Sequence, residues 1–249
     1  MIYIILLIFL VGIYLIYENK VFKVNKVILK NQKISCKIKI VQISDYHLNP
    51  LINIDKLKRV IKKFSPDLVF FTGDLINRNS SEKDIYKLEK LVKIFETTTF
   101  FVSGNHEFEN NNKKVLYDIL NKYEIKSLDN KNIVFKDINI CGKFYKGKSS
   151  NLVYLDNMYN ILLIHDPLDF IYNESKNFDL VLSGHIHGGQ VRLPLVGALI
   201  DPYYNIFPKY SKGFYKIRNS LLFISSGLGS KFFLRTFNRV ELNLFELNN

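Results

Sequence analysis

The sequence predicts an α/β protein in which a parallel sheet is covered by helices, behind an apolar N-terminal segment. Short apolar runs at residues 37–44, 67–73 and 98–104 have the composition of buried strands. Between them, residues 54–64 and 84–95 place Leu, Ile and Val at helical spacing with lysines on the opposite face. This β-α-β-α-β alternation is typical of a parallel sheet with helices packed on it.

The second half of the chain predicts a second, more mixed sheet. Strand patterns recur at residues 161–164, 179–183 and 221–225, and hairpins are expected near 133–140 and 214–223. The chain has 249 residues, of which 47% are hydrophobic, so it can bury one sizeable core. Together the two halves favour one folded domain that contains two sheets.

The N-terminus predicts a membrane anchor. Residues 2–17 carry no charge, and as a helix they would span roughly 24 Å, slightly less than a hydrocarbon core of about 30 Å. No basic residue precedes this run, and Glu18, Asn19 and Lys20 follow it where a cleavage site would need small residues. An uncleaved anchor is therefore favoured over a signal peptide.

We expect a single-pass protein of the cell membrane, with a transmembrane anchor at residues 1–19, a juxtamembrane segment at 20–36 and a folded domain at 37–249. Four lysines follow the anchor, namely Lys20, Lys23, Lys26 and Lys30. Because positively charged residues tend to stay on the cytoplasmic side, the domain is expected on the cytoplasmic face.

The composition narrows the range of partners without choosing among them. The formal net charge of +12 suits nucleic acid, an anionic membrane surface or a phosphorylated substrate, although solvated lysines on a Lys-rich chain would give the same value. No nucleic-acid-binding module or aromatic stacking platform is visible in the sequence, so no nucleic-acid partner is expected. Cys36 and Cys141 lie far apart and outside any Cys/His cluster, which argues against a disulfide framework or a thiolate zinc site.

The positions of the five histidines carry the strongest signal in the chain. Each histidine ends or directly follows a predicted strand, and none is expected in a helix. They occur with carboxylates, an amide and glycines, in the order Asp45-Tyr46-His47, Gly73-Asp74, Gly104-Asn105-His106-Glu107, His165-Asp166-Pro167 and Gly184-His185-Ile186-His187. Side chains beyond the carboxyl ends of parallel strands converge on one cleft, so these motifs can form a single site.

The chemistry of these side chains predicts a site for divalent metals. In Asp45/His47 and in His185/His187, the i, i+2 spacing puts both side chains of a pair on the same side of an extended backbone. Glycines directly before three of the motif residues let the backbone turn sharply and approach an ion closely. Carboxylate, imidazole and amide oxygen are ligands that divalent Mn, Fe or Zn accept, and the lack of thiolate argues against a structural zinc site.

The ordered motifs D-x-H, GD, GNHE, H and GHxH resemble those of the calcineurin-like metallophosphoesterase superfamily, from residue 37 to the C-terminus. The resemblance implies an α/β sandwich of two mixed β-sheets flanked by helices, and a metal-dependent phosphoesterase activity. Residues 187–194, together with residues 226–229, Asn238 and Arg239, are similar to a branch of membrane-associated bacterial phosphodiesterases that includes the chlamydial-type UDP-2,3-diacylglucosamine pyrophosphatase.

Position by position, the resemblance assigns seven metal ligands. It gives Asp45, His47 and His187 to one ion, gives Asn105, His165 and His185 to the other, and makes Asp74 the bridge. The implied cofactors are two divalent ions, Mn, Zn or Fe, with Mn preferred. His106 is left free of metal as the catalytic residue, a general acid that protonates the leaving oxygen or stabilises the phosphoryl charge. Glu107 either orients His106 or is a solvated loop carboxylate.

Four weaker features each leave two interpretations open. Gln190 and Arg192 either reach a substrate phosphate from the rim of the site or belong to an ordinary strand. Asp166 either tunes the histidine before it or caps the loop before a proline. The apolar, proline-containing segment 193–210 either packs on the core or lines an acyl-chain site at the membrane. The basic-aromatic stretch 231–235 either contacts the bilayer or forms a strand or turn.

These features predict a dinuclear-metal hydrolase that cleaves a phosphodiester or pyrophosphate bond, in a membrane-associated, lipid-linked substrate such as UDP-2,3-diacylglucosamine in lipid A synthesis. The alternative enzyme is a broad-specificity phosphodiesterase or phosphatase. A nuclease or phosphoprotein phosphatase ranks lower because no nucleic-acid module is visible. A non-catalytic metal-binding scaffold would show gaps in the ligand set, whereas a competent residue fills every motif position.

Overall fold

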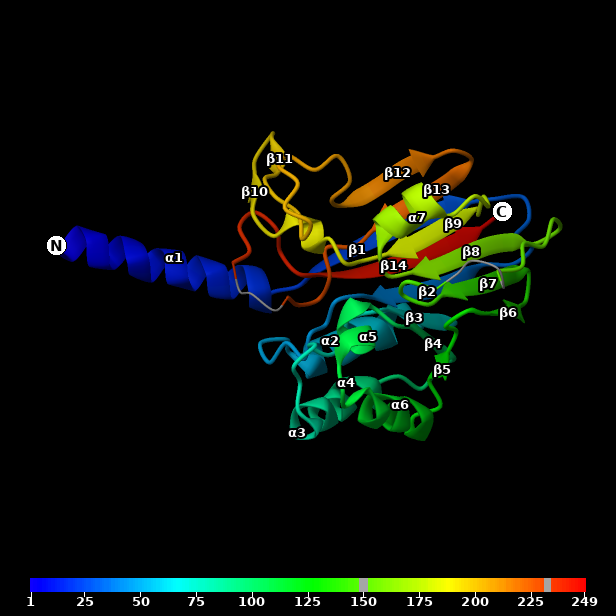
Figure 1. Ribbon diagram of the computed structural model, residues 1–249, viewed down its shortest axis with the longest axis horizontal. Helices are drawn as coiled ribbons and strands as arrows, with labels where there is room; N and C mark the ends of the chain where they lie inside the picture. Colours follow the sequence, from blue (N-terminus) through cyan, green and yellow to red (C-terminus); the bar gives the residue numbers. More distant parts are fainter. Residues whose placement is uncertain (148–151, 231–233) are drawn as a thin grey trace.

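Two six-stranded sheets face each other across an apolar core, with helices on their outer faces (Figure 1). The computed structural model describes residues 1–147, 152–230 and 234–249. The first sheet contains, in spatial order, β1 (Lys23–Lys30), β14 (Glu241–Asn248), β2 (Ile38–Ile43), β3 (Leu68–Thr72), β4 (Thr99–Val102) and β5 (Lys126–Ser127). The second contains β12 (Gly213–Ile217), β13 (Ser220–Ile224), β9 (Leu180–Ser183), β8 (Tyr159–Ile164), β7 (Ile138–Lys143) and β6 (Lys131–Phe135).

Both sheets are mixed. In the first sheet β14 pairs antiparallel with β2, and all other neighbours are parallel. In the second sheet the outer strands β12 and β6 pair antiparallel with their neighbours, whereas β13, β9, β8 and β7 are parallel. The predicted sandwich of two mixed sheets is therefore confirmed, and so are the predicted hairpins, which correspond to β6–β7 and β12–β13.

Strands that are buried on both faces explain the continuous apolar runs of the sequence. In β2, Ile38 and Ile40 face the core between the two sheets, whereas Val41 and Ile43 face the helices. Successive side chains of a strand point to opposite faces. Since apolar layers cover both faces of β2, these four side chains are apolar on either face. The same arrangement holds in β3.

Helices cover the outer faces of both sheets. Side chains of α2 (Ile54–Phe64), α3 (Glu82–Ile85), α4 (Glu89–Val92) and α6 (Lys113–Lys122) pack on the first sheet, and α7 (Pro167–Asn173) packs on the second. Helix α2 has the predicted limits. The helix expected at 84–95 is instead divided into α3, the 3-10 turn Tyr86–Leu88 and α4.

The expected juxtamembrane segment contains a strand that the sequence did not predict. Strand β1 pairs in parallel with β14 along its whole length, and the side chains of Asn25 and Asn243, 218 positions apart, are hydrogen-bonded at 3.0 Å. No local pattern signals a partner that distant. The lysines at both ends of β1 are exposed, as is common on an edge strand. The first sheet therefore begins within residues 20–36.

Helix α1 (Ile2–Lys20) projects from one end of the sandwich (Figure 1). In the described part of the chain it is the one helix whose length and composition would let it cross a membrane. Its 19 residues correspond to roughly 28 Å, close to a hydrocarbon thickness of about 30 Å. Only Glu18 and Asn19, at its C-terminal end, are buried. Helix α1 is thus a candidate anchor.

Most of the segment 193–210 is exposed, although Ala198 is buried and Tyr210 packs against the apolar cluster that α7 covers. It holds the end of β10 (Arg192–Leu193), strand β11 (Gly197–Ala198) and an irregular loop. Its exposed large apolar side chains are Leu193, Leu195, Val196, Ile200, Tyr203, Tyr204, Ile206 and Phe207. The core-packing interpretation is therefore wrong for most of the segment, because the rule that apolar residues are buried fails at these positions. Of the basic-aromatic stretch 231–235, residues 231–233 lie outside the described residues.

Candidate metal centre

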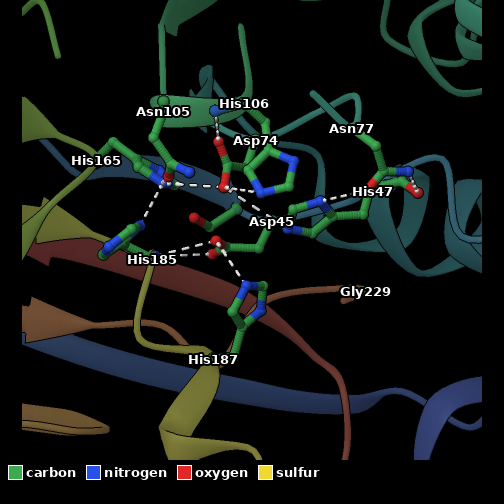
Figure 2. A network of polar contacts seen from close by, with 12 residues as sticks. Asp45, His47, Asp74, Asn77, Asn105, His106, His165, His185, His187 and Gly229 are labelled. Carbon is green, nitrogen blue, oxygen red and sulfur yellow. Dashed lines mark hydrogen bonds and ion pairs between the residues drawn. The ribbon is translucent and has the colours of Figure 1, made fainter. Parts of the chain in front are cut away.

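The five motifs meet where strands of both sheets end. Each predicted ligand lies just beyond the carboxyl end of a strand: Asp45 and His47 after β2, Asp74 after β3, Asn105 after β4, His165 after β8, and His185 and His187 after β9. Their side chains point toward one another (Figure 2). One expectation is wrong, because two histidines lie in helical turns: His106 in the short helix α5 (Asn105–Glu109) and His187 in the 3-10 turn His187–Gly189.

The predicted ligands form two groups that share Asp74. Each group is defined by ligand atoms that all lie within 4.8 Å of one another: Asp45, His47, Asp74 and His187 in the first, and Asp74, His165 and His185 in the second. Asn105 joins the second group, since its Oδ1 is 3.1 Å from His165 Nε2. All seven residues are buried. This division is the one that the resemblance implied, and metal binding by these residues stays a prediction.

The Asp74 carboxylate lies at the centre of the cluster. Its Oδ2 is 3.2 Å from His165 Nε2 and 3.7 Å from His47 Nε2, while its Oδ1 accepts a hydrogen bond of 2.9 Å from the backbone N–H of His106. Burial raises the pKa of Asp74, but the neighbouring His165 outweighs burial and holds the pKa well below its usual range. An ionised carboxylate between imidazoles of both groups has the position that a bridging ligand needs.

Hydrogen bonds on the outer nitrogens turn the Nε2 atoms of two imidazoles toward this centre. The Nδ1 of His47 is 3.0 Å from Asn77 Oδ1, and the Nδ1 of His165 is 2.8 Å from the Thr72 carbonyl. Since these oxygens only accept, both rings carry a proton on Nδ1 and present Nε2 inward. Among the described residues, the buried Nε2 of His47 has no hydrogen-bond partner. A buried lone pair beside a carboxylate is an arrangement that a cation satisfies.

The charges of the cluster also fit cations. Burial lowers the pKa of His165, but the Asp74 carboxylate outweighs burial and raises the pKa to about 10. Burial raises the pKa of Asp45 to about 6. Two buried carboxylates thus favour positive charge beside them, which divalent ions held by the surrounding imidazole and amide donors would provide. The donor set suits divalent Mn, Zn or Fe.

The backbone at the cluster adopts conformations that most residues avoid. Five of the seven predicted ligands have a positive φ: Asp45 (50°), His47 (49°), Asp74 (54°), His185 (68°) and His187 (51°). Left-handed conformations of non-glycine residues cost of order 1–3 kcal/mol each and persist only where the surrounding structure imposes them, commonly at functional sites. These unfavourable backbone conformations therefore lower local stability and orient the five side chains toward one centre.

Glycines leave the space that the cluster needs. A Cβ atom at Gly73 would lie 2.4 Å from His165 Nδ1, and one at Gly184 would lie 2.3 Å from Asp45 Oδ2. Gly73 also has a φ of 87°, which glycine adopts without steric cost. At both positions glycine thus lets the backbone lie close to a predicted ligand, and close approach to an ion stays a prediction.

His106 borders the cluster but belongs to neither of the two groups found among the described residues. Its Nδ1 accepts a hydrogen bond of 3.0 Å from the backbone N–H of Arg78. The proton of the neutral ring is therefore on Nε2, which is 3.9 Å from Asp74 Oδ2. Burial lowers the pKa of His106 and so favours this neutral form. The Nε2–H group can donate to a phosphoester in the adjoining pocket.

Glu107 is not solvated, and its hydrogen bonds go to backbone groups. Its fully buried carboxylate accepts hydrogen bonds of 2.7–3.1 Å from four backbone N–H groups, those of Asp74, Leu75, Ile76 and Gly104. As the third residue of α5 it caps that helix. The interpretation of Glu107 as a solvated loop carboxylate is therefore wrong, and its influence on His106 is through the helix that both residues share. The carboxylate ties the loop that carries Asp74 to the start of α5, which is a positioning role.

We predict that Glu107→Gln lowers the free energy of unfolding by about 3 kcal/mol, because a hydrogen bond to a charged acceptor contributes about 1.5–3 kcal/mol and the amide would turn an N–H group toward backbone donors. Urea unfolding of the metal-free protein measures this. The matched control is Glu89→Gln, which removes a surface ion pair with Lys122 and should change stability by less than about 0.5 kcal/mol. Equal stabilities of the two variants would contradict the positioning role.

The weaker candidates have separate positions. Gln190 borders the pocket over the cluster. The Arg192 guanidinium instead donates to the Gly188 carbonyl at 2.8 Å and to the Ser211 hydroxyl at 3.1 Å, so it braces the loop after β9 and does not reach toward a substrate phosphate. Asp166 is the N-cap of α7, which confirms the capping interpretation.

Sequence reasoning missed two arginines at the site. Arg78 borders the pocket and pairs with Glu109 at 3.0 Å; it follows Asp74 in the same loop, and that proximity could have identified it. Arg235 is fully buried and donates to the carbonyls of Ser226 and Gly229, with Nη2 3.5 Å from His187 Nδ1. Arg235 and His187 are 48 positions apart, so no local signal joins them.

A pocket of about 640 Å³ opens over the cluster. Its polar lining includes Asp74, Asn105, His106, His185 and His187. Its remaining lining is largely apolar and aromatic, and comes mostly from the exposed segment 193–210 and its neighbours: Val191, Ile200, Pro202, Tyr203, Tyr204 and Leu234. The pocket therefore joins the candidate metal centre to an apolar rim.

The chain is similar in sequence to known metallophosphoesterases. The family model described as calcineurin-like phosphoesterase matches residues 38–189. An uncharacterized metallophosphoesterase of Bacillus subtilis, YkuE, is 30% identical over 228 residues, which are 84% of this chain and 78% of that protein. The UDP-2,3-diacylglucosamine pyrophosphatase LpxG of Chlamydia muridarum is 26% identical over 82% of each chain.

A solved structure supports the same fold. The purple acid phosphatase PPD1 from yellow lupin (Lupinus luteus) superimposes with a TM-score of 0.50 and 13% identity, over 80% of this chain and 46% of that one. The family match extends over more than half of this chain and includes all seven predicted ligands. With its buried His/Asp centre for divalent metal, the chain belongs to the calcineurin-like phosphoesterase family and is a metal-dependent phosphoesterase.

Proposed function

We propose that the protein cleaves a phosphodiester or pyrophosphate bond in a lipid-linked substrate of the membrane, of the kind represented by UDP-2,3-diacylglucosamine. The observation that carries this proposal is the pocket, which combines the candidate metal centre with the apolar side chains of Ile200, Tyr204 and Leu234. An amphiphilic phosphoester needs both surfaces. The activity for which the Chlamydia relative is named and the apolar helix α1 support the same class of substrate.

The proposed roles follow from the geometry of the centre. Divalent cations, for which we propose Mn²⁺, would supply an activated water and positive charge for the phosphoryl oxygens. Asp45, His47 and His187 would hold one ion, Asn105, His165 and His185 the other, and Asp74 both. The Nε2–H group of His106 would donate to the leaving oxygen. At the rim, Arg78 and Gln190 would bind phosphate oxygens, since charge-assisted hydrogen bonds suit them.

The proposed location is the cytoplasmic face of the cell membrane, with α1 as a single-pass anchor. The shaft of α1 is exposed from Ile2 onward, and a bilayer would cover it. Lysines follow the helix, which favours a cytoplasmic domain. A cysteine added to β6 of a Cys36→Ser, Cys141→Ser variant should react with an impermeant reagent only in opened cells, and its labelling in intact cells would contradict this orientation.

The substrate class predicts a preference for acylated substrates. Full-length, Mn²⁺-loaded protein in nanodiscs is expected to hydrolyse UDP-2,3-diacylglucosamine with a kcat/KM at least about 100-fold above that for UDP-glucosamine, since apolar contact contributes about 0.8 kcal/mol per buried CH₂ and about 1.4 kcal/mol is tenfold. Similar kcat/KM values for both compounds and for bis-p-nitrophenyl phosphate would favour a broad-specificity phosphodiesterase instead.

A variant of the apolar rim sharpens this test. Ile200→Asn should raise KM for the acylated substrate and leave hydrolysis of bis-p-nitrophenyl phosphate nearly unchanged, because only the acylated substrate uses the rim. Val134→Asn on β6, where the side chain is also exposed, is the matched control and should change neither activity. Parallel loss of both activities in Ile200→Asn would show that the residue supports the fold.

A further inference from the structure

The domain is fixed to the end of α1 and is not loosely tethered to it. The backbone N–H of Asn238 donates to the Glu18 carboxylate at 2.5 Å, and that of Val240 donates to the Glu18 carbonyl at 3.0 Å. One turn earlier, the Tyr14 hydroxyl accepts a hydrogen bond of 2.7 Å from the backbone N–H of Phe237. These contacts set the orientation of the domain relative to the helix.

The segment 234–239 that makes these contacts has its polar residues inside and its apolar residues outside. Arg235 and Asn238 are buried and hydrogen-bonded, whereas Leu234 and Phe237 are both 59% exposed. A loop that faces water would have the reverse arrangement. The Phe237 ring contacts the Tyr14 ring of α1 at a centroid distance of 5.9 Å, so this apolar surface continues directly onto the helix.

The segment 193–210 presents the same kind of surface. In this segment, all of which the structure describes, the single acidic residue is Asp201, which is buried and accepts hydrogen bonds from the loop itself. The exposed charge is Lys209, and the exposed large side chains are apolar or tyrosine. Leu195 is fully exposed and Ile206 is 74% exposed. Apolar tips with a basic residue are typical of segments that lie in a membrane interface.

The two segments form one surface. A parallel bridge joins Val191 to Thr236, and the Arg192 backbone N–H donates to the Thr236 carbonyl at 3.0 Å. Figure 1 shows β10, β11 and the loop before β14 at the end of the domain from which α1 projects. We call the exposed residues Leu195, Val196, Ile206, Phe207, Leu234 and Phe237 the apolar end surface. Leu234 also borders the pocket over the metal centre.

We propose that the apolar end surface inserts into the interfacial layer of the bilayer that α1 crosses, so that the pocket opens along the membrane surface. A bilayer fits this surface because the surface is continuous with the exposed shaft of α1, and one apolar phase would cover both. The inference rests on the proposed function for the anchor. It narrows the substrate to phosphoesters held at the depth of lipid head groups, since the domain cannot swing away from the membrane.

The chain contains no tryptophan, which allows a direct test. Phe207→Trp places a single fluorophore on the apolar end surface of the full-length protein in nanodiscs, and Val134→Trp, on β6 at the opposite end of the domain (Figure 1), is the matched control. With brominated lipids, Phe207→Trp should lose most of its emission and Val134→Trp should lose none. Ile206→Trp is a second reporter if the first variant misfolds.

If brominated lipids quench Phe207→Trp no more than Val134→Trp, the inference is overturned. That result would point to a protein partner or to a bare surface. Quenching does not depend on turnover, so the two proposals fail separately. Strong quenching without a preference for acylated substrates would reject the lipid-linked substrate and retain membrane insertion. A preference for acylated substrates without quenching would retain the proposed lipid-linked substrate and reject membrane insertion.

Discussion

Replacing Asp74 with asparagine is expected to lower hydrolysis by on the order of 10³–10⁴-fold and to reduce the metal content of the purified protein. Asp74 is the one residue that both candidate ligand groups contain, and its carboxylate lies within 3.7 Å of imidazoles from both groups. Charge stabilisation at a metal centre contributes several kcal/mol to a phosphoryl transition state, and about 1.36 kcal/mol is tenfold in rate. The amide keeps the size of the carboxylate and loses its charge.

The metal content is measured by mass spectrometry on protein freed of excess metal, and turnover by release of p-nitrophenol. Asp55→Asn, at an exposed position in the first turn of α2, is the matched control and should retain both metal and activity. If Asp74→Asn bound two ions and turned over as the parent does, the two groups could not form a centre bridged by Asp74.

The clustering of the seven predicted ligands could be predicted from the sequence because each lies within a few residues of the end of a buried strand. A buried parallel strand is a short apolar run, and the polar residue that ends it is placed at the carboxyl edge of the sheet whatever the rest of the fold does. Asp74 after β3 and His165 after β8 are of this kind. The same short stretch of sequence thus predicts both a buried strand and the position of the candidate ligand that follows it.

Features that depend on distant partners could not be read in this way. Glu107 resembles an ordinary loop carboxylate until the N–H groups of Asp74, Leu75 and Ile76, which precede it by 31–33 positions, converge on it. Arg192 has the sequence spacing of a rim residue, yet its guanidinium donates hydrogen bonds to a loop carbonyl and a serine hydroxyl. Strand β1 has its partner at the other end of the chain.

The exposure of the segment 193–210 could not be predicted for a different reason. Its composition is that of a core segment, and burial is the default for apolar residues of a soluble domain. Composition alone does not tell whether the apolar phase that covers such a segment is the protein core or a bilayer. The exposure of Leu195 and Phe207 shows that the protein core does not cover these side chains, and a bilayer is the apolar phase that we propose for them.

His106→Ala is expected to retain both metal ions and to lose about 10²–10⁴-fold in kcat, the usual effect of removing a positioned acid. The ring is outside both ligand groups among the described residues, and the Arg78 backbone N–H occupies its Nδ1. Its Nε2–H is therefore the group that faces a substrate.

Substrates with different leaving groups distinguish two roles for the Nε2–H group of His106. If it donates to the leaving oxygen, the loss in His106→Ala should be large for an alkyl phosphodiester, whose alkoxide needs a proton, and small for bis-p-nitrophenyl phosphate, whose phenolate leaves without one. Equal losses for both esters would place the donated hydrogen bond on a phosphoryl oxygen instead. Loss of metal together with rate would make His106 a ligand. The hydrogen bond from Arg78 argues against that outcome, because Nδ1 is already engaged and the Nε2 proton would have to leave first.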